Sequence, residues 1–262
     1  MNSRSKMIFN LILFITFLSI FSCRFGNNNE SIPAIKPDRT YNPVGYDLSD
    51  PDKIDNLPGI LHEISGITEI DNSTIACIQD EYGVLVIYDL SKNSIRKYFT
   101  FQSNGDYEGI ARAGDNIFVL RSDGILYEIP DYKSAGLTSL SFKTGIPAKD
   151  NEGLCYFKKN NMLLMGPKSD IEEKKKDKRA IYGFSLETKK LLDKPVIKFD
   201  LEEIKEYATK KKLNLPVTKK KNEKSEPKIE LRTSAIGIHP LTKKLFLISG
   251  MEQILFVFEL NG

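Results

Sequence analysis

Histidine and cysteine are scarce in this chain, and the common catalytic motifs are missing. The 262 residues include two histidines and three cysteines. The sequence has no Gly-x-Ser-x-Gly elbow, no His-Glu-x-x-His pair and no phosphate-binding glycine loop, so the usual motif-bearing hydrolases and nucleotide-binding enzymes are not indicated. No Cys-x-x-Cys spacing occurs either, which argues against a cysteine metal site. Cys77 and Cys155 lie in apolar runs and are predicted to be buried free thiols.

The chain also lacks a strong excess of charge of one sign. Its 38 basic and 35 acidic residues give a net charge of +3, too small to indicate a nucleic-acid partner. A lysine-rich stretch at about 200–228 is predicted to be a solvated insertion that begins with a short helix near 201–212. Contact of this stretch with anionic lipid is the alternative. It lacks the interleaved aromatic residues of a single-strand nucleic-acid binder.

The N-terminus carries a targeting signal. Arg4 and Lys6 precede a predominantly apolar run at 7–21, which has the length of a signal-peptide core and is short for a membrane span. Residues 20–23 resemble a bacterial lipobox, so 1–23 is predicted to be a lipoprotein signal peptide with Cys23 as the lipidated residue. An ordinary signal peptide is the alternative. Residues 24–40 are predicted to form a flexible tether, and the protein to be a membrane-anchored lipoprotein of the bacterial cell envelope, at the outer membrane or its periplasmic face.

A short phrase recurs along the rest of the chain, at residues 64–67, 107–110, 151–154 and 233–236. Ser65, Glu108 and Glu152 follow one another at intervals of 43 and 44 residues. Each phrase opens a series of short apolar runs rich in Ile, Val, Leu, Phe and Tyr, separated by Asn, Asp, Gly or Lys turns. A period of roughly 40 to 50 residues with several strands per unit is typical of β-propeller blades.

The fold class is therefore predicted to be all-β, a β-propeller of four-stranded antiparallel blades over residues 41–262. Asp123-Gly124 predicts a tight hairpin of type I′ in the second repeat. Four repeats are visible, and the last lacks its outer strand. Because an open propeller leaves faces and strand edges uncovered, we expect five or six blades in a full-length chain, with the C-terminal part missing here. Closure by a partner, or by an N-terminal strand at 40–48, is the alternative.

The start of the first strand and the end of the second strand of each blade meet at one rim of a propeller. The starts contribute Glu63 with Ser65, Asp106 with Glu108, Asp150 with Glu152, and Arg232 with Ser234, each pair at two-residue spacing and so predicted to share a face. Asp123 is predicted to reach the rim from an adjacent turn. The candidate ligand or metal residues are thus Glu63, Asp106, Glu108, Asp123, Asp150 and Glu152, with Arg121 and Lys168 as basic neighbours.

Three interpretations of this rim are open. In the first, Glu108 pairs with Arg121 and Glu152 pairs with Lys168, and the charges only lock neighbouring strands. In the second, the rim binds a divalent cation, most plausibly calcium, through Glu108 and Glu152, because calcium takes six to eight oxygen ligands. In the third, the carboxyl groups bind a ligand or act on a substrate as acid and base.

These phrases, together with 79–83, 120–124 and 234–240, resemble the SdiA-regulated family of bacterial β-propellers. The resemblance runs in order from about 57 to 260. It implies a secreted or envelope-associated propeller, distantly similar to the esterase-like phytases and without an established reaction. The sequence thus predicts a lipid-anchored envelope propeller that binds a small molecule or another envelope protein. A metal-assisted phosphoesterase is the alternative, with calcium the one cofactor considered.

Overall fold

The computed structural model describes residues 50–169, 177–213, 215, 217–218 and 226–260. The chain divides into two compact units, Met1–Asp50 and Pro51–Gly262. Several predictions therefore lie outside the described residues: the signal peptide with Cys23, the tether, the start of the propeller domain at Tyr41 and the strand at 40–48. No helix in the described part is long and apolar enough to cross a membrane.

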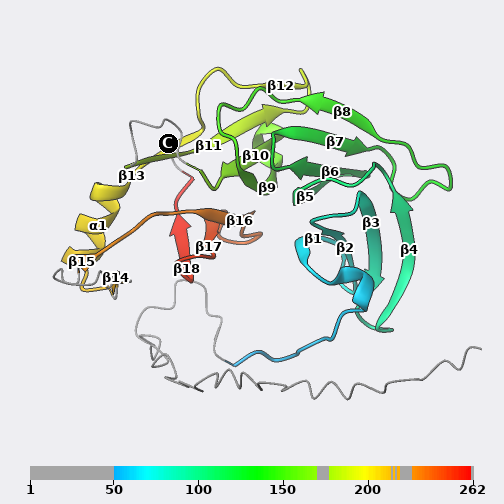
Figure 1. The fold of residues 1–262 in the computed structure, drawn as a ribbon, viewed down its shortest axis with the longest axis horizontal. Coiled ribbons are helices and arrows are strands. Elements are labelled where there is room, and N and C mark those ends of the chain that lie inside the picture. Colours follow the sequence, from blue (N-terminus) through cyan, green and yellow to red (C-terminus); the bar gives the residue numbers. More distant parts are fainter. Residues whose placement is uncertain (1–49, 170–176, 214, 216, 219–225, 261–262) are drawn as a thin grey trace, which may run out of the picture. The chain divides into compact units, whose positions relative to one another are not determined.

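Short antiparallel sheets succeed one another along the second unit (Figure 1). The first sheet comprises β1 (Ile64–Asp71), β2 (Thr74–Gln79), β3 (Val84–Asp89) and β4 (Ser94–Thr100), after the 3-10 turn η1 (Gly59–Leu61). The second comprises β5 (Tyr107–Ala113), β6 (Asn116–Arg121), β7 (Ile125–Ile129) and β8 (Leu140–Lys143). Each is a meander in which every strand pairs with the next along the chain.

The third and fourth sheets depart from this plan at their outer strands. The third has β9 (Asn151–Phe157), the turn η2 (Lys158–Asn160), β10 (Met162–Pro167) and β11 (Lys178–Ser185), whose outer edge pairs with two pieces, β12 (Lys190–Leu191) and β13 (Ile197–Asp200). The fourth comprises β16 (Thr233–Ile238), β17 (Leu245–Ser249) and β18 (Ile254–Phe258). The predicted fold, an all-β propeller whose last visible blade lacks its outer strand, is confirmed for the described residues.

The lysine-rich insertion lies between the third and fourth sheets. Its helix α1 (Leu201–Lys210) confirms the predicted helix, and the small hairpin of β14 (Val217–Thr218) and β15 (Glu226–Pro227) follows it. Asp200 caps α1 by accepting a hydrogen bond from the Glu202 backbone N–H at 3.1 Å. Leu201 and Ala208 are buried, which docks one face of the helix on the sheet core.

The middle strands explain why their sequences are apolar without interruption. In β6, Ile117 and Val119 face a core shared with the first sheet, whereas Phe118 and Leu120 face a core shared with the third sheet. A strand covered on both faces has no polar side, because successive side chains point in opposite directions. The outer strand β4, in contrast, alternates between exposed and partly buried residues.

Neighbouring sheets touch through their first strands. β1 contacts β5, β5 contacts β9, and β9 contacts β16. At Gly109, β5 lies directly against the backbone of β9. An added Cβ would lie 2.7 Å from the Glu152 carbonyl oxygen and 2.7 Å from the Leu154 Cβ. The glycine of the recurring phrase is therefore required by contact with the next sheet.

The hairpin between β6 and β7 forms as predicted, but its turn type is different. Gly124 has a φ of +84°, while Asp123 is not among the residues with positive φ, so the turn is not type I′. The Gly124 N–H donates to the Arg121 carbonyl at 2.8 Å, and the Asp123 carboxylate accepts from the Ile125 N–H at 3.2 Å. A three-residue connection with one left-handed glycine replaces the predicted two-residue turn.

We predict that Gly109→Ala destabilises the protein because a methyl group has no room between the second and third sheets. The expected loss in free energy of unfolding is about 1–3 kcal/mol, the usual cost of overpacking. Urea unfolding followed by far-UV circular dichroism measures it. Gly237→Ala is the matched control, since an added Cβ on this β16 residue would meet no heavy atom within 4 Å. Equal losses in the two variants would contradict the close-contact explanation.

Candidate functional site

A cavity lies where the first strands of the four sheets come together. Its volume is about 280 Å³, and it is lined by residues of β1, β5, β9 and β16. The lining residues are Ile64, Ser65, Gly66, Ile67, Glu108, Gly109, Ile110, Glu152, Leu154, Ser234, Ala235 and Ile236. Each of the four recurring phrases thus contributes to one cavity.

A β-bulge at the start of each first strand places a polar side chain in this cavity. The register shifts fall between Ile64 and Gly66, Tyr107 and Gly109, Asn151 and Gly153, and Thr233 and Ala235. One residue is left out of each ladder, and we call these four the bulge residues: Ser65, Glu108, Glu152 and Ser234. A bulge re-aims the extra side chain and strengthens the local twist. Every polar side chain in the cavity lining is a bulge residue.

The bulges are held by contacts to the neighbouring sheet. The Ser65 hydroxyl donates to the Tyr107 carbonyl at 2.6 Å, which ties β1 to β5. The Tyr107 N–H donates to the Asp80 carbonyl at 2.8 Å. In the next repeat the Asn151 N–H and side-chain amide donate to the Ser122 carbonyl at 3.1 and 2.8 Å. The residue before the bulge is thus fixed to the preceding sheet in both repeats.

The two carboxyl groups in the cavity have different surroundings. The Glu152 side chain is 8% exposed and forms an ion pair with Lys168, whose own pKa is raised by that hydrogen bond. Burial, followed by the charges of Glu152 and Asp106, raises the pKa of Glu108 to about 8. Glu108 has no ion-pair partner among the residues that the structure describes. One cavity carboxyl is therefore neutralised by a cation, and the other favours its protonated form.

The remaining predicted rim residues do not enter the cavity. Asp106 is exposed and does not line the cavity, although its charge and a side-chain hydrogen bond to Glu108 contribute to the raised pKa of Glu108. The Asp150 carbonyl accepts from the Lys168 N–H at 2.7 Å. Glu63 is half-exposed and lies beside His62.

The basic residues of the rim are each held by a carboxylate. Arg121 binds Asp123 through two nitrogens, at 3.0 and 2.8 Å, and the Tyr127 hydroxyl at 2.9 Å. This pairing lowers the pKa of Asp123. The prediction that Glu152 pairs with Lys168 is confirmed, whereas the predicted pairing of Glu108 with Arg121 is wrong. Arg121 pairs with Asp123 instead of Glu108 because Asp123 lies only two residues away, in the adjoining turn.

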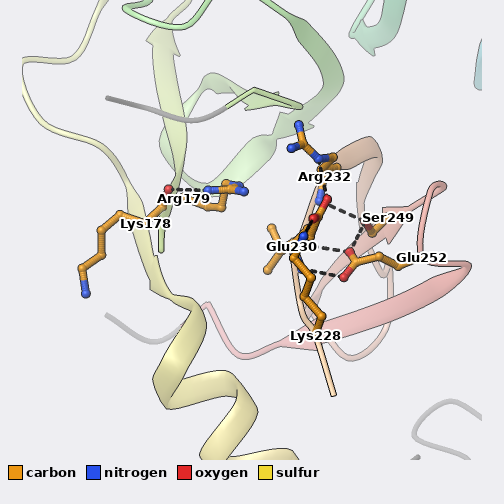
Figure 2. Close-up of polar contacts among 8 residues, drawn as sticks. Lys178, Arg179, Lys228, Glu230, Arg232, Ser249 and Glu252 are labelled. Carbon is orange, nitrogen blue, oxygen red and sulfur yellow. Dashed lines mark hydrogen bonds and ion pairs between the residues drawn. The ribbon is translucent and has the colours of Figure 1, made fainter. Parts of the chain in front are cut away.

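Arg232 lies at the start of the fourth sheet, in a separate polar group (Figure 2). Its Nε donates to Glu230 at 2.8 Å, and its backbone N–H donates to the Ser249 hydroxyl at 2.9 Å. Glu252 accepts from that hydroxyl at 2.6 Å and from the Leu231 N–H at 2.9 Å. This group fixes the irregular segment that leads into β16, and so holds Ser234 in place.

No group of three or more His, Cys, Asp or Glu residues that could hold a metal ion occurs in the described part of the chain. The predicted free thiols Cys77 and Cys155 are confirmed as buried, and burial raises the pKa of each to about 12. His239 accepts hydrogen bonds from the Leu241 and Thr242 N–H groups, which is a structural role.

The apolar walls of the cavity were not among the predicted site residues. Ile67 is 54% exposed and Ala235 is also exposed, on the first and fourth sheets. Their position, after the bulge residue of each phrase, is the signal that could have identified them. The bulges themselves have no signal in a single repeat, because register depends on the partner strand.

The fold and the site together define a β-propeller with a carboxyl-bearing axial cavity. No protein-family model and no curated protein match the chain. Among solved structures, a glutaminyl cyclase from Myxococcus xanthus is similar, with 10% identity, a TM-score of 0.46 and coverage of 75% of this chain and 72% of that one. Virginiamycin B lyase from Staphylococcus aureus shows 13% identity, a TM-score of 0.42 and coverage of 79% and 59%. Both are β-propeller-like proteins.

A mitotic checkpoint complex structure is also similar, with 10% identity and a TM-score of 0.42, and the match covers 75% of this chain and 49% of that one. This chain therefore spans about half the length of that relative. At such identities and TM-scores these structures carry no argument about activity or ligand.

We predict that the stability of the protein falls as pH rises because Glu108 is more readily protonated in the folded chain than in the unfolded one. The stabilising contribution of the protonated carboxyl is complete below the unfolded pKa of about 4.5 and is lost as pH rises through about 8. Glu108→Gln mimics the protonated form, so its stability relative to wild type should increase across this window and level off above it. Urea unfolding at a series of pH values measures the difference.

Glu69→Gln is the control for the pH series, because Glu69 is an exposed carboxylate on β1 outside the cavity lining. The difference in free energy of unfolding between Glu69→Gln and wild type should not change across the same pH range. A Glu108→Gln difference that is equally flat would show that Glu108 does not favour its protonated form.

Proposed function

We propose that the protein is a ligand-binding β-propeller of the bacterial cell envelope, and that its ligand occupies the axial cavity. The observation that carries this proposal is the set of bulges: every sheet contributes one polar bulge residue to the same apolar-walled cavity. Small-molecule sites in proteins are typically apolar pockets with a few convergent polar groups, which is the composition of this one. β-bulges are over-represented beside such sites.

The alternative of a phosphoesterase is less well supported by the geometry. Hydrolysis of a phosphate ester needs cations that face the transferred phosphoryl group. Lys168, Arg121 and Arg232 are each bound to a carboxylate, and the cavity lining carries carboxyl groups instead. No cationic side chain of the described residues lines the cavity to bind an anionic substrate. Binding without catalysis is the function that these charges favour.

We also propose the finer assignment, a lipid-anchored protein of the SdiA-regulated type. The support comes from the sequence: the apolar run at 7–21, the lipobox-like residues 20–23 and the ordered phrases from 57 to 260. A lipid on Cys23 would hold the propeller at a membrane surface through the segment 24–40. Calcium at Glu108 and Glu152 remains a prediction, which a rise in melting temperature at millimolar calcium would support.

We predict that Ala235→Trp abolishes ligand binding, because an indole at this position fills the cavity from β16. A fragment library screened by ligand-observed NMR against the wild type supplies the probes. Ala135→Trp is the matched control, since Ala135 is exposed between β7 and β8 and does not line the cavity. Fragments bound by wild type should be retained by Ala135→Trp and lost in Ala235→Trp. Equal retention in both variants, or no bound fragment in wild type, would contradict the proposal.

We predict that Cys23 carries the lipid. Cells grown with a clickable fatty acid should label the wild-type protein and leave Cys23→Ser unlabelled, because the thiol is the acceptor. Cys77→Ser is the control, since that buried thiol has no part in anchoring. Equal labelling of wild type and Cys23→Ser would rule out the anchor while leaving the cavity proposal untouched.

A further inference from the structure

The lining of the axial cavity is chemically one-sided. Its walls are aliphatic, and its polar groups are two hydroxyls and two carboxyls. The Ser65 hydroxyl donates a hydrogen bond to the Tyr107 carbonyl, so its oxygen can only accept a further one. No basic side chain of the described residues lines the cavity. The site therefore offers hydroxyl and carboxyl oxygens to whatever enters it, and Glu108 is the carboxyl without a cationic partner among the described residues.

The positive charge near the cavity does not balance this lining. Lys168 binds Glu152 from outside the lining, and Arg121 is bound by Asp123. The group around Glu108 thus has three carboxyls, Asp106, Glu108 and Glu152, for one lysine. Without a cation beside it Glu108 holds its proton at neutral pH, and a ligand that brings a positive charge lowers its pKa and so favours the carboxylate.

We propose that the axial cavity binds a small organic cation, an ammonium group with a compact apolar body. The ammonium lies against Glu108 and the hydroxyl oxygens, and the apolar body packs on Ile67, Ile110 and Leu154. This inference rests on the proposed function, since it names the ligand class of that same cavity. A volume of about 280 Å³ restricts the ligand to small molecules, because drug-sized ligands occupy pockets of roughly 300–1,000 Å³.

The walls favour an organic cation over a metal ion. Calcium takes six to eight oxygen ligands, whereas aliphatic side chains make up most of this lining. The same walls give an apolar body a favourable environment, since removing apolar surface from water stabilises a complex. An ammonium ion bound by a carboxylate also gains charge-assisted hydrogen bonds, roughly twice as strong as neutral ones.

Three probes of similar size and different charge test the proposal: benzylammonium, benzyl alcohol and benzoate. Their affinities are measured by isothermal titration calorimetry on the full chain at low salt and at a pH of about 8.5, above the Glu108 pKa of about 8. Wild type should prefer benzylammonium to benzyl alcohol by about tenfold, the equivalent of one charge-assisted contact, and should not bind benzoate. Glu108→Gln should reduce the preference for benzylammonium to about threefold or less. Glu69→Gln, the control, should keep the wild-type preference.

The outcomes separate the ligand class from the site itself. Equal binding of the three probes, stronger binding of benzoate, or an unchanged preference in Glu108→Gln overturns the cation class. If Ala235→Trp then still abolishes the binding that remains, the cavity stands as the ligand site. A calcium-induced rise in melting temperature that Glu108→Gln removes, without binding of benzylammonium, also overturns the proposal and assigns the carboxyls to a metal. Benzylammonium binding that persists in Ala235→Trp places the cation elsewhere and overturns it too.

Discussion

The close contact between neighbouring first strands is the constraint on which the rest of this propeller depends. At Gly109 the backbone of the third sheet occupies the space that a side chain would need. Gly66 and Gly153 have the same role, with Ile110 and Thr233 as the neighbouring residues. Each first strand also has a bulge beside this contact, and its extra residue lines the cavity. The same few residues of each phrase thus provide both the packing between the sheets and the polar lining of the cavity.

The two carboxyl groups of the cavity affect the stability of the protein in different ways. Glu152 is buried and has Lys168 as its partner, the condition under which a buried carboxylate is tolerated. Glu108 faces the same cavity without an ion-pair partner among the described residues and has a pKa raised to about 8. A carboxyl kept in such surroundings lowers stability at high pH, and positions of this kind are where proteins trade stability for function.

Polar contacts away from the axis fix the sheets relative to one another. Glu128 on β7 is buried and pairs with Lys189 of the third sheet at 2.6 Å. The Ser139 hydroxyl donates to the Phe101 carbonyl at 2.7 Å, across the first and second sheets. Each contact joins residues far apart in sequence, so none could be assigned from a single repeat. These hydrogen bonds and ion pairs have a required geometry, so they fix the relative positions of sheets whose apolar cores pack without a directional preference.

The sequence by itself determined the repeats, most of the strands, the helix at 201–210 and the polar residues of the cavity lining, which are Ser65, Glu108, Glu152 and Ser234. These features depend on local periodicity and on turn residues such as Gly124, whose positive φ is a property of a few neighbouring residues. The tertiary structure alone decided the bulges, the separation of Asp106 from the cavity and the pairing of Arg121 with Asp123 rather than Glu108. The physical reason is that register and ion pairing depend on the distance to a partner strand, and one residue of slip moves a side chain to the opposite face.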